Sequence, residues 1–345
     1  MAKRTFLLGA GFSREAGLPL GNELIYFILN KLKNSANVLD TGDTGVYQEI
    51  TDFLKEIQKI KLPELTKDVE LLLTYIDLAL LNNSVGIFTR YASPEDLRLF
   101  RMKLSGALVR AFDGAHLELT RKFSDGGIFS KFCEQLEKGD SVITFNYDLV
   151  VEQGLWLQNK WTFLEGYGLT KNINDFQDTW GGKYPTDRPK ESLVKVYKLH
   201  GSLGWIYDDA NEQIIFIGMP NYFLGYTGFF CERNLNASGA RWDEGTTFIE
   251  PSYVKQFNRP IILDIWKGAF HEIIQSNELI IIGYSLPEAD AAARIFLATG
   301  VRSSQISSIT VVNPSNEVFD KFEGLFGRKV VRKKVTFKEW VENEI

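Results

Sequence analysis

Thr5 to Pro19 reads TFLLGAGFSREAGLP, and this stretch decides the fold. The apolar run of residues 5–8 stops at glycine, as a buried strand does, and apolar residues recur at helical spacing from about Asn22 to Lys33. The order strand, glycine loop, helix is typical of a loop that holds phosphate at a helix N-terminus. However, Arg14 stands where a dinucleotide fingerprint has its third glycine, and no acidic residue ends a second strand about 20 residues later. The loop alone leaves nucleotide binding and a structural turn both open, and it disfavours a standard dehydrogenase.

Further apolar segments alternate with helical patterns along the rest of the chain. We expect strands at residues 141–145, 193–199, 278–282, 309–312 and 330–337, with shorter ones at 213–217 and 246–249. We expect helices at residues 149–157, 261–275 and 288–299, with a short helix before the final strand and irregular loop over 160–193. Continuous apolar strands that alternate with helices form parallel sheets covered on both faces. The fold class is therefore α/β, a Rossmann-like parallel sheet with helices on both faces.

The segment between the first two expected strands has a different pattern. Residues 46–137 are mainly helical in periodicity and contain no convincing strand, and the segment before them is polar and turn-like. We therefore expect residues 34–137 to be an inserted helical subdomain. Residues 1–33 and 138–345 would then form one nucleotide-binding core.

Composition excludes several classes of protein. The 345 residues carry a formal net charge of −5, and Lys and Arg are spread along the chain, so no direct nucleic-acid signal is present. The one dense basic run, at residues 328–334, reads as the solvated face of a strand. No segment approaches the roughly 20 apolar residues of a membrane span, and two distant cysteines suggest neither a disulfide framework nor a metal site. We expect a cytoplasmic protein without a metal.

Polar or glycine-rich clusters follow the buried strands directly. These clusters are Gly9-Ala10-Gly11, Asn146-Tyr147-Asp148, His200-Gly201, Gly283-Tyr284-Ser285 and Asn313-Pro314. In an open parallel sheet, ligands bind beyond the carboxyl ends of the strands. We therefore expect all of these clusters to converge on one crevice.

Taken together and in order, these clusters resemble the motifs of sirtuins and sirtuin-like proteins. GAGFSREAGLP (residues 9–19) resembles the cofactor loop of that family, TFNYD (144–148) its Asn-x-Asp motif and KLHGS (198–202) its His-Gly motif. GYSL (283–286) resembles its Gly-x-Ser loop, and Asn313 with Pro314 its adenosine-side segment. The resemblance covers roughly residues 1–33 and 140–315.

The resemblance implies an NAD site and assigns roles within it. The NAD pyrophosphate would be cradled by Gly9, Ala10, Gly11, Phe12 and Ser13. Asn146 and Asp148 would lie beside the nicotinamide and its ribose, and His200 would act on that ribose as a general base or an orienting group. The remaining cofactor contacts, to phosphate and adenosine, would come from Gly283, Tyr284, Ser285 and Asn313.

The sequence also departs from sirtuin deacetylases. Those enzymes carry a zinc module held by four cysteines, and Cys133 and Cys231 cannot build one. The pattern resembles instead the bacterial sirtuin-like effectors of anti-phage defence, which hydrolyse NAD to nicotinamide and ADP-ribose. Such effectors imply a homo-oligomer or a separate regulator such as a HerA-type ATPase. The residue chemistry agrees: the nicotinamide leaves without an acid, so the reaction needs a group that places water and a base near neutral pKa, as Asn146 and His200 provide.

Several alternatives stay open. Asp148 could cap the helix after it, Ser285 could cap the helix at 288–299, and His200 could be a hydrogen-bonded core histidine. At the level of function, the chain could be a non-catalytic module that binds NAD or ADP-ribose and reports it to a partner. It could also be an NAD-dependent protein deacylase.

Overall fold

A six-stranded parallel sheet forms the centre of the molecule. The computed structural model describes residues 3–36, 43–59, 69–82, 91, 93–119, 127–163, 165–169, 191–208, 213–216, 246–248, 260–288 and 290–345. The strands run in the order β3-β2-β1-β7-β8-β9, and every neighbouring pair is parallel. Their bounds are β1 Arg4–Leu8, β2 Ser141–Thr144, β3 Lys195–Lys198, β7 Glu278–Ile282, β8 Ser308–Val312 and β9 Val331–Lys333. The Rossmann-like fold class expected from the sequence is confirmed.

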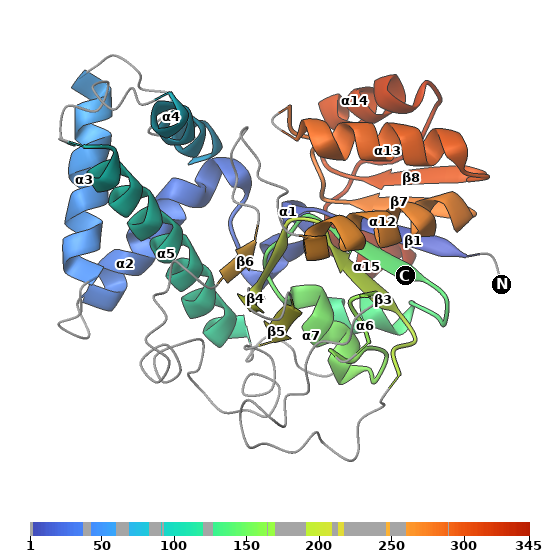
Figure 1. The fold of residues 1–345 in the computed structure, drawn as a ribbon. Helices are drawn as coiled ribbons and strands as arrows, with labels where there is room; N and C mark the ends of the chain where they lie inside the picture. The colour runs from blue at the N-terminus through green and yellow to red at the C-terminus, as the bar shows by residue number, and fades with distance from the viewer. Residues whose placement is uncertain are drawn as a thin grey trace.

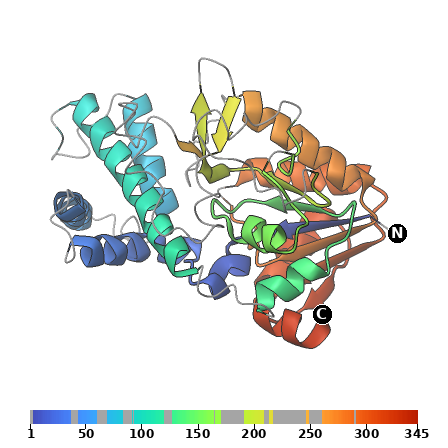
Figure 2. The ribbon, with the colours of Figure 1, turned by 90° about the horizontal axis from the view of Figure 1, so that it is seen from below.

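Helices cover both faces of this sheet (Figures 1 and 2). On one face α12 (Pro260–Gln275), α13 (Ala291–Ser303) and α14 (Asn316–Phe326) pack in sequence, and on the other α6 (Ile128–Glu134) contacts α7 (Val150–Leu157) and α15 (Phe337–Glu344). The inner strands are buried on both sides, which explains their continuous apolar runs. Within the described ranges, no helix is both long and apolar enough to cross a membrane.

A second group of helices stands beside the sheet, next to the end of β1 that leads into α1 (Figure 1). These helices are α2 (Leu24–Ala36), α3 (Asp43–Lys59), α4 (Val69–Leu81) and α5 (Pro94–Leu119). Helix α5 contacts the other three, with Phe27 against Phe112 and an ion pair of 2.8 Å between Arg101 and Asp77. The described residues between β1 and β2 contain no strand, as the sequence predicts, and the division into core and insertion stays a prediction.

A second, antiparallel sheet of three strands lies between the main sheet and these helices (Figure 1). It contains β4 (Gly201–Asp208), β5 (Gln213–Phe216) and β6 (Thr246–Phe248). The expected short strands at 213–217 and 246–249 are confirmed, but β4 was not predicted. Its sequence begins with Gly201 and repeats glycine at Gly204, which reads as a turn. Gly201 has a φ of 75°, so the chain turns sharply there and continues as a new strand.

The C-terminal end differs from the prediction as well. The strand expected over 330–337 stops at Lys333, and α15 begins at Phe337. Thr336 accepts a hydrogen bond from the Glu339 amide, and the Glu339 side chain accepts one from the Thr336 amide. This reciprocal capping box starts a helix where alternation alone suggested a strand. Most of the loop expected over 160–193 lies outside the described residues.

Candidate functional site

The glycine loop after β1 is pressed against the loop after β7. The Gly9 amide donates to the Ile282 carbonyl at 3.0 Å, and the Gly11 amide donates to the Gly283 carbonyl at 2.9 Å. A Cβ atom on Gly9 would lie 2.5 Å from the Cα of Tyr284, and one on Gly11 would lie 2.8 Å from the Cα of Gly283. The two glycines are therefore needed for this close approach, whatever else the loop binds.

Helix α1 (Ala10–Ser13) is short, and its Phe12 side chain holds it against the core. The Phe12 ring is buried against Phe129, Phe132 and Phe337, with centroid distances of 5.4, 5.3 and 4.6 Å. Phe337 belongs to α15, so the C-terminal helix supports the glycine loop. The Phe12 side chain thus faces the core, and any contact that Phe12 makes with a ligand would come from its backbone.

Asn146 ties the loop after β2 to the glycine loop. Its amide nitrogen donates to the Gly9 carbonyl and to the Ser13 hydroxyl, both at 3.0 Å. Its backbone amide donates to the Thr144 hydroxyl at 3.0 Å, so the residue is held from two sides. The side-chain oxygen of Asn146 has no partner in the described part of the chain, and it is the atom left for a ligand.

Asp148 is buried at the start of α7. Its Oδ1 accepts from the Val150 amide at 3.0 Å, the first amide of α7, but the N-cap position itself is Leu149, so Asp148 supports the start of the helix from one residue before the cap. Its carbonyl accepts from the buried ammonium of Lys198, which also lies 2.9 Å from a carboxylate oxygen of Glu152. The second role expected for Asp148, beside a ligand, stays a prediction.

His200 is 5% exposed and follows β3. Its ring lies 5.0 Å from the ring of Phe145 and 6.1 Å from that of Tyr147, the two neighbours of Asn146. Its Nε2 lies 3.2 Å from Oδ2 of Asp290, which is 1% exposed, at an ion-pair distance but without the geometry of a hydrogen bond. The structure therefore brings His200 next to the Asn146 loop and gives it a carboxylate neighbour.

The loop after β7 joins the same cluster. Tyr284 stacks on Phe145 with ring centroids 4.5 Å apart and donates its hydroxyl to Asp290 at 3.2 Å. Burial, with Asp290 beside it, raises the pKa of Tyr284 well above its usual value, and burial likewise raises the pKa of Tyr147. Gly283 has a φ of 62°, which keeps the loop against Gly11. Ser285 is exposed and is not the cap of α13, because Asp290 is that cap.

Asn313 lies one strand further along. The side-chain oxygen of Asn313 accepts from the Ser315 backbone amide at 3.0 Å. The backbone amide of Asn313 donates to the Lys333 carbonyl at 3.0 Å. The link to the other loops runs through the backbone, because the Gly283 amide donates to the Val312 carbonyl at 3.0 Å. The loops after β1, β2, β3 and β7 thus meet through direct contacts, whereas Asn313 stands at the margin.

Asp290 is the functional candidate that the sequence reasoning missed. It ends the stretch of residues 283–290 that resembles the sirtuin-like defence effectors, but no role was predicted for it. The signal that could have found it is an acidic residue directly before a helical pattern, the position of an N-cap, three residues after Pro287. Its Oδ1 accepts from the Ala293 amide at 3.4 Å.

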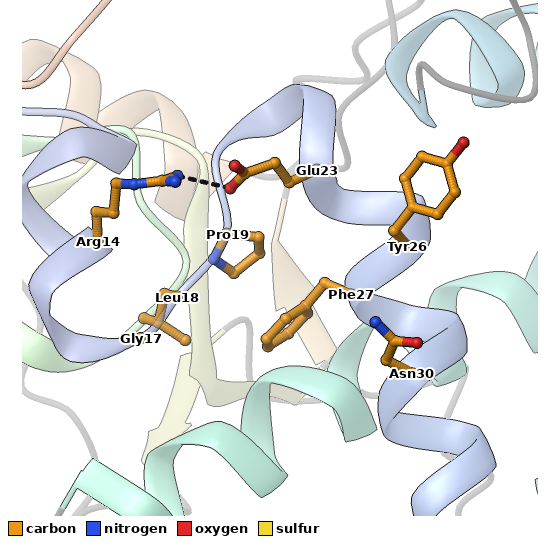
Figure 3. A pocket seen from close by; sticks show the side chains of 8 residues that line it. All are labelled: Arg14, Gly17, Leu18, Pro19, Glu23, Tyr26, Phe27 and Asn30. Carbon is orange, nitrogen blue, oxygen red and sulfur yellow. Dashed lines mark hydrogen bonds and ion pairs between the residues drawn. The ribbon is translucent and has the colours of Figure 1, made fainter.

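A separate open pocket of about 370 Å³ lies beside the segment that follows α1 (Figure 3). An ion pair of 2.6 Å joins Arg14 to Glu23, and the Arg14 guanidinium lowers the pKa of that carboxyl group. None of the predicted site residues lines this pocket. Its lining residues are Arg14, Gly17, Leu18, Pro19, Glu23, Tyr26, Phe27 and Asn30. Among the residues that the structure describes, no group of three or more His, Cys, Asp or Glu side chains could hold a metal ion.

Comparisons with known proteins identify the middle of the chain. Residues 140–297, from β2 into α13, match the family model of the SIR2-like domain. The chain gives no match among the curated proteins. The match contains the Asn146, His200 and Gly283 loops, and it excludes the glycine loop after β1 and Asn313.

Solved structures that resemble the chain are sirtuins of low sequence identity. One is a triple mutant of a Sir2 homologue in complex with 2′-O-acetyl ADP-ribose, with 14% identity, 99% of this chain and 90% of that chain covered, and a TM-score of 0.42. Another is Sir2 with a p53 peptide and NAD⁺, with 15% identity, 99% and 90% covered, and a TM-score of 0.36. At these TM-scores the fold assignment rests on the strand order alone. By sequence, residues 140–297 are similar to the SIR2-like domain.

Proposed function

We propose that this protein is an NAD hydrolase, which cleaves the bond between nicotinamide and ribose to give nicotinamide and ADP-ribose. A SIR2-like domain supports the use of NAD as a substrate, and two of the similar solved structures are described as complexes with NAD⁺ or an ADP-ribose derivative. Gly9 to Ser13 would hold the pyrophosphate, and the loops after β2 and β3 would surround the nicotinamide ribose.

The observation that carries the proposal is the fixed position of Asn146. Both hydrogens of its amide nitrogen are engaged, by the Gly9 carbonyl and the Ser13 hydroxyl, which leaves the side-chain oxygen as an acceptor of fixed orientation. An acceptor held at the meeting point of two loops can orient a water molecule or the substrate amide. A reacting group that is held in a fixed orientation lowers the activation barrier more than the same group on a mobile loop.

His200 supplies the other group that the reaction needs. In hydrolysis the C–N bond breaks, its electron pair neutralises the nicotinamide ring, and the oxygen of water bonds to the ribose carbon. The proton of that water goes to a base, and an imidazole is suited to accept it near neutral pH. His200 lies against Phe145 and Tyr147, on either side of Asn146 in sequence, so the base lies next to the loop that carries the orienting amide.

Hydrolysis is favoured over peptide deacylation by the cysteine content. The resembled deacetylases hold a zinc module with four cysteines, whereas these 345 residues contain two. Cys133 is buried on α6, and burial raises the pKa of its thiol, which makes it a core residue and a poor metal ligand.

The test is nicotinamide release by the purified chain without any peptide, compared with three variants. We expect Asn146→Ala and His200→Ala each to lower turnover by about 100-fold or more. His271→Ala is the matched control, because His271 is exposed on α12 and its loss should leave turnover unchanged. Equal activity in all four proteins would place the reaction elsewhere.

Binding of NAD is measured on the same samples, because it separates the competing functions. Tight binding without turnover in the parent chain would indicate a module that senses NAD or ADP-ribose. Release of nicotinamide only after addition of an acylated peptide would indicate a deacylase. The absence of both NAD binding and NAD turnover would contradict the proposed use of NAD.

A role in anti-phage defence, a homo-oligomeric state and a separate regulator such as a HerA-type ATPase stay predictions from the resemblance. If the protein acts by depleting NAD, cells that express the parent chain should plate phage poorly and lose NAD during infection. Cells that express the Asn146→Ala chain at the same level should do neither.

A further inference from the structure

The buried carboxylate of Asp290 has a position that helix capping does not explain. Its Oδ1 accepts from the Ala293 amide, which is the cap of α13, but its Oδ2 faces away from that helix end. Oδ2 lies 3.2 Å from both Nε2 of His200 and the hydroxyl of Tyr284. Burying a carboxylate is costly unless charged or hydrogen-bonding groups surround it, and serine or asparagine would cap the helix without that cost.

The surroundings of His200 fix which groups can act on its charge. Asp290 faces it from the start of α13 and Tyr147 from the loop after β2, and Tyr284, from the loop after β7, contacts the same Asp290 oxygen. Glu70 of α4 and Asp290 both act on the hydroxyls of Tyr147 and Tyr284. Arg294 of α13 acts on Tyr284. Both tyrosines stay neutral over the working range, because the pKa of each is raised, so among the residues that the structure describes Asp290 is the charged side chain in contact with the imidazole.

We propose that Asp290 is a positioning residue for His200, holding the imidazole against the Asn146 loop and stabilising the positive charge that the ring acquires when it accepts a proton. This inference rests on the proposed hydrolysis for its role in turnover, although the pairing itself does not. An opposite charge within about 4 Å favours the charged form of a histidine, and a buried setting strengthens the effect. The Tyr284 hydroxyl on the same oxygen keeps the carboxylate oriented toward the ring.

The decisive variant is Asp290→Asn, because it removes the charge and little else. Asparagine is as good a helix cap as aspartate when its oxygen takes the place of Oδ1, and its NH2 group, in the place of Oδ2, can donate to the Tyr284 hydroxyl oxygen. Tyr284→Phe is the matched comparison, since it removes the other neighbour of Oδ2 and leaves the charge in place. The pair separates an electrostatic role of Asp290 from a packing role.

The first readout is the titration of His200 by NMR, in the full chain and without NAD. The chain has three histidines, so the signal of His200 is identified by its loss in His200→Ala. We expect His200 to titrate about one to three pH units lower in Asp290→Asn than in the parent chain, and to change much less in Tyr284→Phe. Titration at the same pH in Asp290→Asn and the parent would overturn the pairing.

The second readout is turnover. If His200 is the base, Asp290→Asn should lower kcat by about 10- to 100-fold, with a small change in KM, and move the acid limb of the pH profile to lower pH. A shifted titration with unchanged kcat would overturn the role in turnover and leave the proposed hydrolysis standing. Because the titration needs no substrate, a parent chain without NAD hydrolysis would still give a clear result on the pairing.

Discussion

The carboxyl edge of the sheet and the outer edge around β9 use the same residue types for different purposes. At the carboxyl edge, the ion pair between Lys198 and Glu152 is fully buried, and Gly283 is in contact with the backbone of another loop. At the outer edge, the exposed side chains of Arg332 and Lys329 meet Glu323, whose side chain is 11% exposed, and a Cβ atom on Gly324 would have open space around it. The basic run predicted to be a solvated strand face lies there. The difference shows that burial, and not the type of contact, decides how much a residue matters.

The largest expected effect is at the buried ion pair. Lys198→Met leaves the Glu152 carboxyl group without its cation in a site where burial already raises its pKa. Removing one partner of a buried pair costs about 3–5 kcal/mol of unfolding free energy. We expect this loss in urea unfolding, together with lower activity, because Lys198 also holds the Asp148 carbonyl.

The double variant Lys198→Met/Glu152→Leu is the control for that prediction. Replacing both charges by apolar side chains of similar size removes the stranded carboxylate, so part of the lost stability should return. A double variant as unstable as the single one would show that the ion pair does not dominate this part of the core.

The two glycines give the second comparison. Gly283→Ala places a Cβ 2.5 Å from the backbone of Gly11 at a φ of 62°, so we expect a loss of about 2–4 kcal/mol and a disturbed glycine loop. Gly324→Ala, in the last turn of α14, where an added Cβ would have no neighbour within 4 Å, should instead stabilise the chain by up to about 1 kcal/mol. Thermal unfolding of both variants checks the pair, and a stable Gly283→Ala chain would contradict the close approach of the two loops.

The smallest expected effect is the pH dependence of folding stability at the outer edge of the sheet. Arg332 and Lys329 lower the pKa of Glu323 to about 2. A carboxyl group with a lowered pKa in the folded state contributes stability above its unfolded pKa of about 4.3, and that contribution disappears as the pH falls toward 2. Glu323→Gln should therefore be slightly less stable than the parent at pH 7 and equal to it near pH 2. Acid titrations of both proteins, at low and high salt, measure this, since the exposed pair is screened.

The sequence predicted most of the main sheet because its strands are continuous apolar runs between breakers. Strand β7 occupies the residues expected, and β1 and β8 differ by one residue at one end. The missed elements are those in which a local signal competes with periodicity. Gly201 and Gly204 indicated a turn where the structure has β4. The alternation through Val335 indicated a strand where the capping box starts α15.

The candidate site divides in the same way. Asn146, His200 and the two glycine loops were found because each directly follows a strand, and the parallel sheet brings such positions together. Asp290 was missed because its proximity to His200 depends on the path of the loop after β7, in which Leu286 adopts a left-handed φ of 51°. The direction of the Phe12 side chain depends on α15, which is more than 300 residues away in sequence and was not predicted to be a helix.

The most direct test of the central claim is the stoichiometry of NAD consumption by the parent chain in the absence of any peptide. Hydrolysis predicts that nicotinamide and ADP-ribose appear in equal amounts, each matching the NAD consumed, and that both fall together in Asn146→Ala. NAD that is bound and recovered intact, or nicotinamide that appears only with an acylated peptide, would contradict the claim.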